Sequence, residues 1–188
     1  MKPFYQGKID TFCAIYAVLN SLRITHSIRT LKARDYFNEV LLELAKNTNE
    51  LEAVLLQTTD YVQLVDRMLE HFSQIMPLYV NKPFTNSSLI SVEQFWKTCQ
   101  SFINQSKNST VIFRFIRYFD PKTPPIVRHW TCIETINDTI MHLYDSSHEA
   151  ESIQNLKKND LVTEEKDLSK SVSILVQPWS VRQVSLPY

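Results

Sequence analysis

The first hundred residues carry apolar positions at the spacing of an α-helix. Between residues 12 and 23 these positions recur every three or four residues and fall on one face, as Ile15, Val18, Leu19 and Leu22. Asp10 or Thr11 is the predicted cap of this helix. The same kind of pattern predicts further helices over residues 31–46, around 50–58, over 61–74 and from Ser91 onward. The N-terminal half is therefore expected to be largely helical.

The second half changes to the patterns of β-strands. Residues 111–119 are β-branched and aromatic, which is typical of a strand. Residues 129–136 and 140–145 are two more predicted strands, and they form a hairpin around Asn137-Asp138. We expect these segments to pair as an antiparallel sheet.

The order of these elements predicts the fold class. A last strand is expected over residues 172–176 and to end before Pro178, whereas residues 146–170 are polar and at best partly helical. Helices first and antiparallel strands second indicate an α+β fold, with an N-terminal helical half packed on an antiparallel β-sheet. The length suits one domain over residues 1–188, with a helical insertion at about 31–75.

Composition excludes several classes of function. The net charge is zero and the charges are scattered, which argues against a nucleic-acid or anionic-membrane partner. No apolar run approaches the roughly 18 residues of a membrane span. The three cysteines make an odd count without paired spacing, so a disulfide framework is not expected. Without a secretory signal, we expect a cytoplasmic protein, or one exported without a cleavable signal peptide.

The single glycine, Gly7, is a second compositional constraint. One glycine cannot supply a phosphate-cradling loop or a dinucleotide fingerprint. It stands beside a glutamine, Gln6, in a segment that leads into the first predicted helix.

Four residues stand where a thiol-dependent active site would need them. Cys13 lies at the start of the first predicted helix, seven positions after Gln6. His129 opens one strand of the predicted hairpin, and Asp145 closes the other. Together they supply a nucleophile, an oxyanion donor, a base and a residue that orients the base.

Each residue type suits its expected role. A thiolate attacks a carbonyl far better than a thiol does, and a helix N-terminus favours negative charge at Cys13. His129 would take the thiol proton, and Asp145 would hold its imidazole in the right tautomer. The Cys13 backbone N–H and the Gln6 amide are the expected oxyanion donors. This chemistry needs no metal or organic cofactor, and no zinc-ligand spacing occurs among Cys99, Cys132, His142 and His148.

The hairpin sets a geometric condition on this site. Asp145 must lie on the same face of the sheet as His129, and residues are exchanged between faces by a one-residue shift in register. An odd-length loop, residues 137–139, meets the condition and pairs Ile133 with Leu143. A two-residue Asn-Asp turn would put the aspartate on the opposite face. The sequence favours neither loop.

Structural roles are the alternative for each residue taken alone. A lone cysteine in an amphipathic helix is usually a core residue, and an aspartate often ends a strand. The agreement in order and local structure favours catalysis. Arg114 and Arg117 interrupt the apolar strand 111–119, and ion pairs at a sheet edge are their predicted role rather than substrate binding.

In these features the sequence resembles the papain-like cysteine peptidase superfamily. The bacteriocin-leader-type peptidases, which cut double-glycine leaders, have a similar pattern, matched here by Gln6, Asp10, Cys13, His129-Trp130 and Asp145. The Josephin-type deubiquitinases have another, matched by Gln6, Cys13-Ala14, Asn20-Ser21-Leu22 and His129-Trp130. The chain departs from the first group at Ala14, where glycine is usual, and from the second at Asp145, where asparagine is usual.

The resemblance implies a papain-like fold and a cysteine peptidase that cleaves a peptide or isopeptide bond. The implied substrate is a peptide or protein, such as a leader peptide or a ubiquitin-like conjugate. The same fold and residues also serve acyltransferases, transglutaminases and amidases. A catalytically silent module that binds a protein partner is the alternative from another class.

Overall fold

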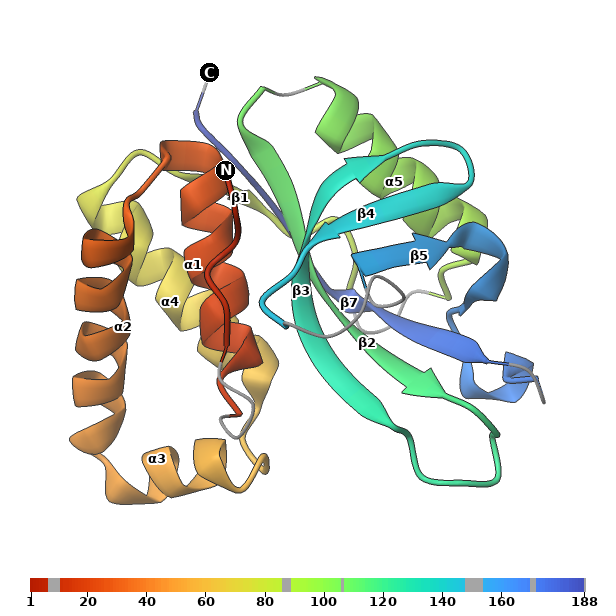
Figure 1. The fold of residues 1–188 in the computed structure, drawn as a ribbon, viewed down its shortest axis with the longest axis horizontal. Coiled ribbons are helices and arrows are strands. Elements are labelled where there is room, and N and C mark those ends of the chain that lie inside the picture. Colours follow the sequence, from red (N-terminus) through yellow and green to blue (C-terminus); the bar gives the residue numbers. More distant parts are fainter. Residues whose placement is uncertain (7–10, 86–88, 106, 148–153, 170–171, 188) are drawn as a thin grey trace.

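A curved, mostly antiparallel sheet forms the centre of the molecule, and helices cover both of its faces (Figure 1). The computed structural model describes residues 1–6, 11–85, 89–105, 107–147, 154–169 and 172–187. The helices are α1 (Cys13–His26), α2 (Thr30–Ala45), α3 (Thr48–Leu55), α4 (Tyr61–Ile75) and α5 (Val92–Gln105). The strands are β1 (Tyr79–Asn81), β2 (Ser109–Tyr118), β3 (Val127–Ile136), β4 (Ile140–Tyr144), β5 (Asn155–Lys157), β6 (Leu161–Val162) and β7 (Ser173–Ser185). The fold is therefore mixed α+β, as the order of patterns predicts.

The helix N-termini show which local predictions hold. Each helix expected from the apolar spacing is present within a few residues of its predicted bounds. The predicted cap of α1 is wrong for Thr11, because Phe12 is the cap residue and gives no side-chain hydrogen bond. Asp10, the other predicted cap, lies outside the described residues, as does Gly7. In α4, by contrast, the Asp60 side chain accepts hydrogen bonds from two backbone N–H groups of the first turn.

The sheet has the strand order β1-β7-β2-β3-β4-β5, and the short β6 pairs with β7 in parallel. The prediction that the last strand ends before Pro178 is wrong, since β7 continues to Ser185. The register of β7 against β2 shifts between Gln177 and Arg182, so Pro178 lies in an irregular stretch of the ladder. A proline lacks an N–H donor and is tolerated where regular pairing is interrupted.

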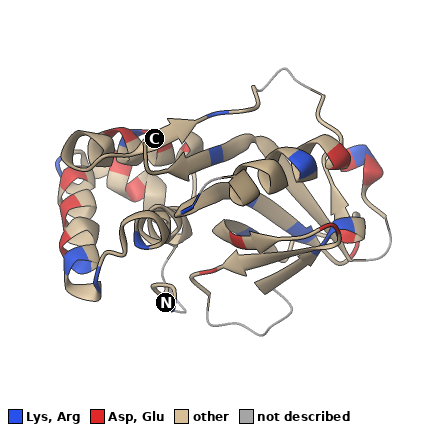
Figure 2. Cartoon of the chain, turned by 90° about the horizontal axis from the view of Figure 1, so that it is seen from above, with Lys and Arg blue, Asp and Glu red and all other residues tan. Residues whose placement is uncertain are grey.

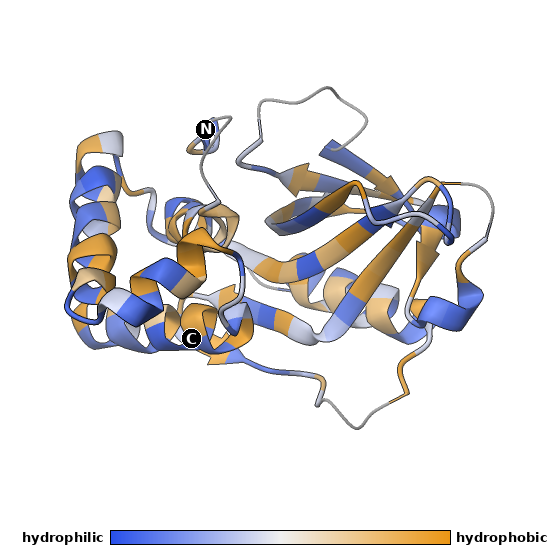
Figure 3. Ribbon diagram, turned by 90° about the horizontal axis from the view of Figure 1, so that it is seen from below, coloured by the Kyte–Doolittle hydropathy of each residue, from blue (hydrophilic) through white to orange (hydrophobic). Residues whose placement is uncertain are grey.

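Two hydrophobic cores lie on opposite faces of the sheet. Ile112, Trp130 and Cys132 pack with α1 and the other N-terminal helices, whereas Phe113 and Ile133 pack with α5. Neighbouring residues of a strand thus belong to different cores, as the period of two requires. The alternation of hydrophobic and hydrophilic positions along the strands is visible in Figure 3. Because α1 packs between the sheet and α4, its N-terminus lies against the strands.

Charged residues of both signs are interspersed along the helices and do not gather on one side of the view in Figure 2. Among the described residues, no helix is long and apolar enough to cross a membrane.

Candidate active site

Cys13 is the first residue of α1, and the helix behind it is tightly packed. Ala14, Ile15, Ala17 and Val18 are all buried, whereas Cys13 itself is partly exposed. The helix dipole and the unpaired N–H groups of a first turn favour negative charge at this position. The two other cysteines, Cys99 and Cys132, are free and fully buried, and burial raises the pKa of both thiols.

His129 and Asp145 form a buried pair between adjacent segments. Nε2 of His129 lies 2.8 Å from Oδ2 of Asp145. The other carboxylate oxygen accepts hydrogen bonds from the backbone N–H and the hydroxyl of Ser147, at 2.7 and 2.6 Å. The loop after β4 thus fixes the Asp145 carboxylate, and the carboxylate in turn fixes the orientation of the His129 ring. Because Nε2 is bound to Asp145, Nδ1 is the ring nitrogen left for Cys13.

The β3–β4 register that brings His129 and Asp145 together does not come from an odd-length loop. Ile136 pairs with Met141, which leaves a two-residue turn at the tip rather than an odd-length loop. An extra residue in β3, Glu134, then shifts the register by one. Ile133 therefore pairs with Leu143, as expected, although through a β-bulge. The bulge, and not the loop length, brings Asp145 to the face of His129.

The charges of the pair are strongly coupled. Burial disfavours the protonated form of His129, but hydrogen bonding and charge interactions with Asp145 and Cys13 outweigh it and raise its pKa to about 10. Burial raises the pKa of Asp145, but the hydrogen bonds and charge of His129 and the hydrogen bonds from Ser147 outweigh burial and hold the pKa of this carboxyl below its usual value. At neutral pH the pair is therefore an imidazolium facing a carboxylate.

Gln6 is held near Cys13 by contacts at both sides of the N-terminal segment. The side chain of the buried Asn20 accepts from the Phe4 N–H at 2.6 Å and donates to the Phe4 carbonyl at 3.2 Å. Two residues later, the Gln6 N–H donates to the Ser146 carbonyl at 2.7 Å, and the Ser146 hydroxyl donates to Gln6 Oε1 at 3.5 Å. The segment therefore bridges α1 and the loop that carries Asp145.

A cavity of about 120 Å³ brings these groups together. It is lined by Gln6, Thr11, Cys13, Gln57, Tyr61, Arg114, Arg128, His129 and Trp130. Asp145 lies behind the ring of His129 and is only 2% exposed. All four residues expected from the sequence thus line this cavity or bond directly to a residue that does.

Four lining residues were not expected at the site. Gln57 follows α3 and has a left-handed backbone, with a φ of 58°. Tyr61 opens α4, and burial together with the charge of Cys13 raises its pKa to about 12. Arg114 and Arg128 come from β2 and β3. Arg128 directly precedes the predicted His129, whereas Gln57, Tyr61 and Arg114 reach the cavity through long-range packing that spacing does not reveal.

The predicted role of the β2 arginines is wrong. Strand β2 lies between β7 and β3, so Arg114 and Arg117 do not stand at a sheet edge. Within the part of the chain that the structure describes, neither forms an ion pair with a carboxylate. Arg114 instead lines the cavity beside Cys13.

A larger cavity, of about 350 Å³, lies away from this chemistry among α2, α3 and α4. Its charged residues already pair with one another, as in the contact of 2.9 Å between His71 and Glu39 and the ion pair of Arg67 with Glu50. Across the described ranges, no group of three or more histidine, cysteine or acidic residues could hold a metal ion. The cavity beside Cys13 is therefore the better candidate for a catalytic site.

No protein-family model matches this sequence, and a search of curated proteins finds no relative.

Proposed function

We propose that the protein is a cysteine peptidase with a papain-like fold, which cleaves a peptide or isopeptide bond. The observation that carries the proposal is the position of His129, whose ring interacts with Cys13 and bonds to the buried Asp145. A cysteine at the N-terminus of a packed helix, facing a histidine and an acid from the sheet, also supports the papain-like assignment.

In the proposed reaction, the Cys13 sulfur attacks the substrate carbonyl carbon and forms a tetrahedral intermediate. The Cys13 backbone N–H and the Gln6 side chain stabilise the oxyanion. The His129 imidazolium then donates its Nδ1 proton to the leaving nitrogen as the C–N bond breaks, and an acyl-enzyme remains. His129, now neutral, takes a proton from water, which attacks the thioester and releases the acid. Asp145 keeps the imidazole oriented throughout both steps.

Alkylation of Cys13 tests the thiolate on which the proposal depends. We would measure the rate of iodoacetamide modification at Cys13 from pH 5 to pH 9, with glutathione as the reference thiol. An activated thiolate remains reactive at pH 6, where glutathione is largely protonated, and His129→Ala should abolish that reactivity. Selectivity over Cys99 and Cys132 is no test by itself, because both are fully buried. A glutathione-like pH profile in the wild-type protein would reject the proposal.

The reaction itself calls for a substrate screen. Peptide libraries and ubiquitin-like conjugates would be incubated with the wild-type protein and with Cys13→Ala, and the products identified by mass spectrometry. Adding a primary amine separates hydrolysis from acyl transfer, because a transferase gives mainly the new amide, whereas a hydrolase still gives mainly the acid. If the protein binds some of these substrates but turns over none of them, the alternative of a catalytically silent module that binds a protein partner is favoured.

A further inference from the structure

Two arginines on neighbouring strands line the cavity beside Cys13. Arg114 of β2 pairs directly with Trp130 of β3, and Arg128 lies two residues before Trp130. Residues two apart on a strand share a face, so both arginines lie on the same face of the sheet. Both border the cavity that also contains Cys13 and His129. Their guanidinium groups are therefore placed beside the proposed nucleophile.

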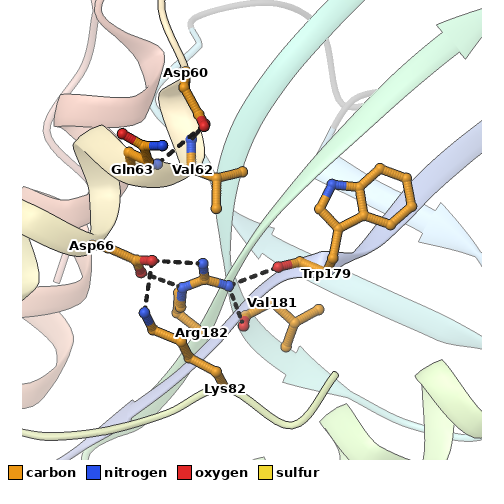
Figure 4. Close-up of polar contacts among 8 residues, drawn as sticks. All are labelled: Asp60, Val62, Gln63, Asp66, Lys82, Trp179, Val181 and Arg182. Atoms are coloured by element: carbon orange, nitrogen blue, oxygen red, sulfur yellow. Dashed lines mark hydrogen bonds and ion pairs between the residues drawn. The ribbon is translucent and has the colours of Figure 1, made fainter. Parts of the chain in front are cut away.

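The described lining of this cavity holds no carboxylate that could neutralise these arginines. The carboxylate whose charge reaches Arg114 is Asp60. Its side chain is engaged in capping α4, where it accepts hydrogen bonds from Val62 and Gln63 at 3.0 and 3.2 Å (Figure 4). The two guanidinium groups are consequently the unbalanced positive charge of the cavity, because the imidazolium of His129 is paired with the Asp145 carboxylate.

A structural arginine in the same protein looks different. Arg182 is 3% exposed and bonds to both oxygens of Asp66, at 2.5 and 3.0 Å. It also donates to the carbonyls of Trp179 and Val181 (Figure 4). Its charge and its donors are accounted for by the protein. The partly buried Arg114 has no such carboxylate among the described residues.

The electrostatic surroundings of Arg114 favour the binding of an anion. Burial lowers the pKa of Arg114, and the charge of Arg128 also lowers it, while Cys13 raises it. A partly desolvated guanidinium beside a second cation is stabilised when an anion arrives. A carboxylate is the group that the planar guanidinium fork binds with two parallel hydrogen bonds.

We propose that Arg114 and Arg128 select substrates that carry a carboxylate beside the bond cleaved at Cys13. The inference rests on the proposed peptidase function and adds its substrate class, an acidic peptide. The carboxylate belongs either to an aspartate or glutamate side chain next to the scissile bond or to a nearby chain terminus. The cavity is small, so the carboxylate must be within a residue or so of the reacting carbonyl.

Two alkylating reagents of nearly equal size test the charge preference without any peptide. Iodoacetate carries a carboxylate where iodoacetamide carries an amide, and both transfer their carbon to the thiolate with loss of iodide. The measured quantity is the rate with iodoacetate divided by the rate with iodoacetamide at Cys13, normalised to the same ratio for glutathione. We expect this normalised ratio to be about 10 or more. Arg114→Met and Arg128→Met should each lower it, and the double variant should bring it close to one.

Arg117→Met is the matched control, because Arg117 lies on the same strand and does not line the cavity. Its ratio should equal that of the wild type. Arg128→Glu, at an exposed position that tolerates substitution, should turn the preference toward iodoacetamide. Cys13 that reacts with iodoacetamide but shows no preference for iodoacetate would overturn this inference and leave the proposed function intact. Cys13 inert to both reagents would reject the two together.

Peptide substrates identify the source of the carboxylate. Matched peptides would carry glutamate or glutamine beside the scissile bond, and a free or amidated C-terminus close to it. A preference in kcat/KM of about tenfold for one acidic form, lost in Arg114→Met/Arg128→Met, is the expected result. Equal kcat/KM for the acidic and amide forms of both pairs would overturn the inference.

Discussion

Two ion pairs of this protein each join a buried cation to an aspartate, but their surroundings differ. Arg182 and Asp66 join β7 to α4, and the described hydrogen bonds of the guanidinium all go to the carboxylate or to backbone carbonyls (Figure 4). His129 and Asp145 join β3 to the end of β4, and the far side of the imidazole faces Cys13 at a cavity.

The difference separates a structural pair from a chemical one. A pair whose hydrogen bonds end on the protein itself stabilises the packing and has no atom to offer a substrate. A pair that borders a cavity beside a thiol places a group with a perturbed pKa, here His129, where a ligand can reach it, and such groups are common at functional sites. Burial of the cation does not distinguish them, since Arg182 and His129 are 3% and 7% exposed.

The largest expected effect is the loss of the thiol. Cys13→Ala should lower kcat by about 10⁴-fold or more, because the described lining of the cavity holds no other thiol and a hydroxyl is a far weaker nucleophile than a thiolate. The free energy of unfolding should hardly change, since the sulfur lies at the edge of the cavity. Cys132→Ala is the matched control. It removes a buried thiol that donates to the Ala17 carbonyl at 3.0 Å, so it should reduce stability and leave kcat unchanged. Wild-type turnover in Cys13→Ala would end the argument for thiol chemistry.

Removal of the proposed oxyanion donor comes next. Gln6→Ala should lower kcat by roughly 100- to 1000-fold, because the amide acts on charge that develops only in the transition state. KM and the rate of Cys13 alkylation should stay close to the wild-type values. Steady-state kinetics and iodoacetamide labelling would measure these quantities. An unchanged kcat would mean that another donor, such as Arg114, completes the oxyanion hole.

The structural pair should respond in the opposite way. Asp66→Asn leaves Arg182 buried beside a neutral partner and should lower the free energy of unfolding by about 3 kcal/mol. Lys82→Met removes the exposed partner of the same carboxylate and should cost less than about 1 kcal/mol. Urea unfolding would give both values. Neither change should alter the pH profile of Cys13 alkylation, and a variant that did so would show that the two pairs are coupled.

A pH dependence of stability is expected to be smaller than the effect of Asp66→Asn. The folded-state pKa of His129 is raised from 6.5 to about 10, so its contribution is complete below 6.5 and is lost as pH rises toward 10. The pKa of Asp145 is lowered from 3.8, so its contribution is present above 3.8 and is lost as pH falls further. The stability difference between wild type and Asp145→Asn should therefore shrink by about 1–2 kcal/mol between pH 6 and pH 9. Urea unfolding at both pH values would measure it, and a constant difference would contradict the coupling.

Local patterns along the chain were sufficient for several features. The helical spacing predicts the helices from α1 to α5, and the β-branched runs predict β2, β3 and β4. The positions of Cys13, His129 and Asp145 relative to those elements indicate where a site could form. These features depend on neighbouring residues and on the 3.6- and 2-residue periods, which a single sequence displays directly.

Tertiary structure decided the features that depend on distant partners. The bulge at Glu134 sets the register between His129 and Asp145, and the hairpin sequence contains no residue that predicts a bulge there. Pro178 lies within β7 because the pairing with β2 is interrupted there, although a proline in a sequence usually ends a strand. Arg114 changes from a predicted edge residue to a neighbour of Cys13 because β2 lies inside the sheet. Register, strand order and cavity lining are set by contacts between residues far apart in the chain, and a local pattern carries no information about those contacts.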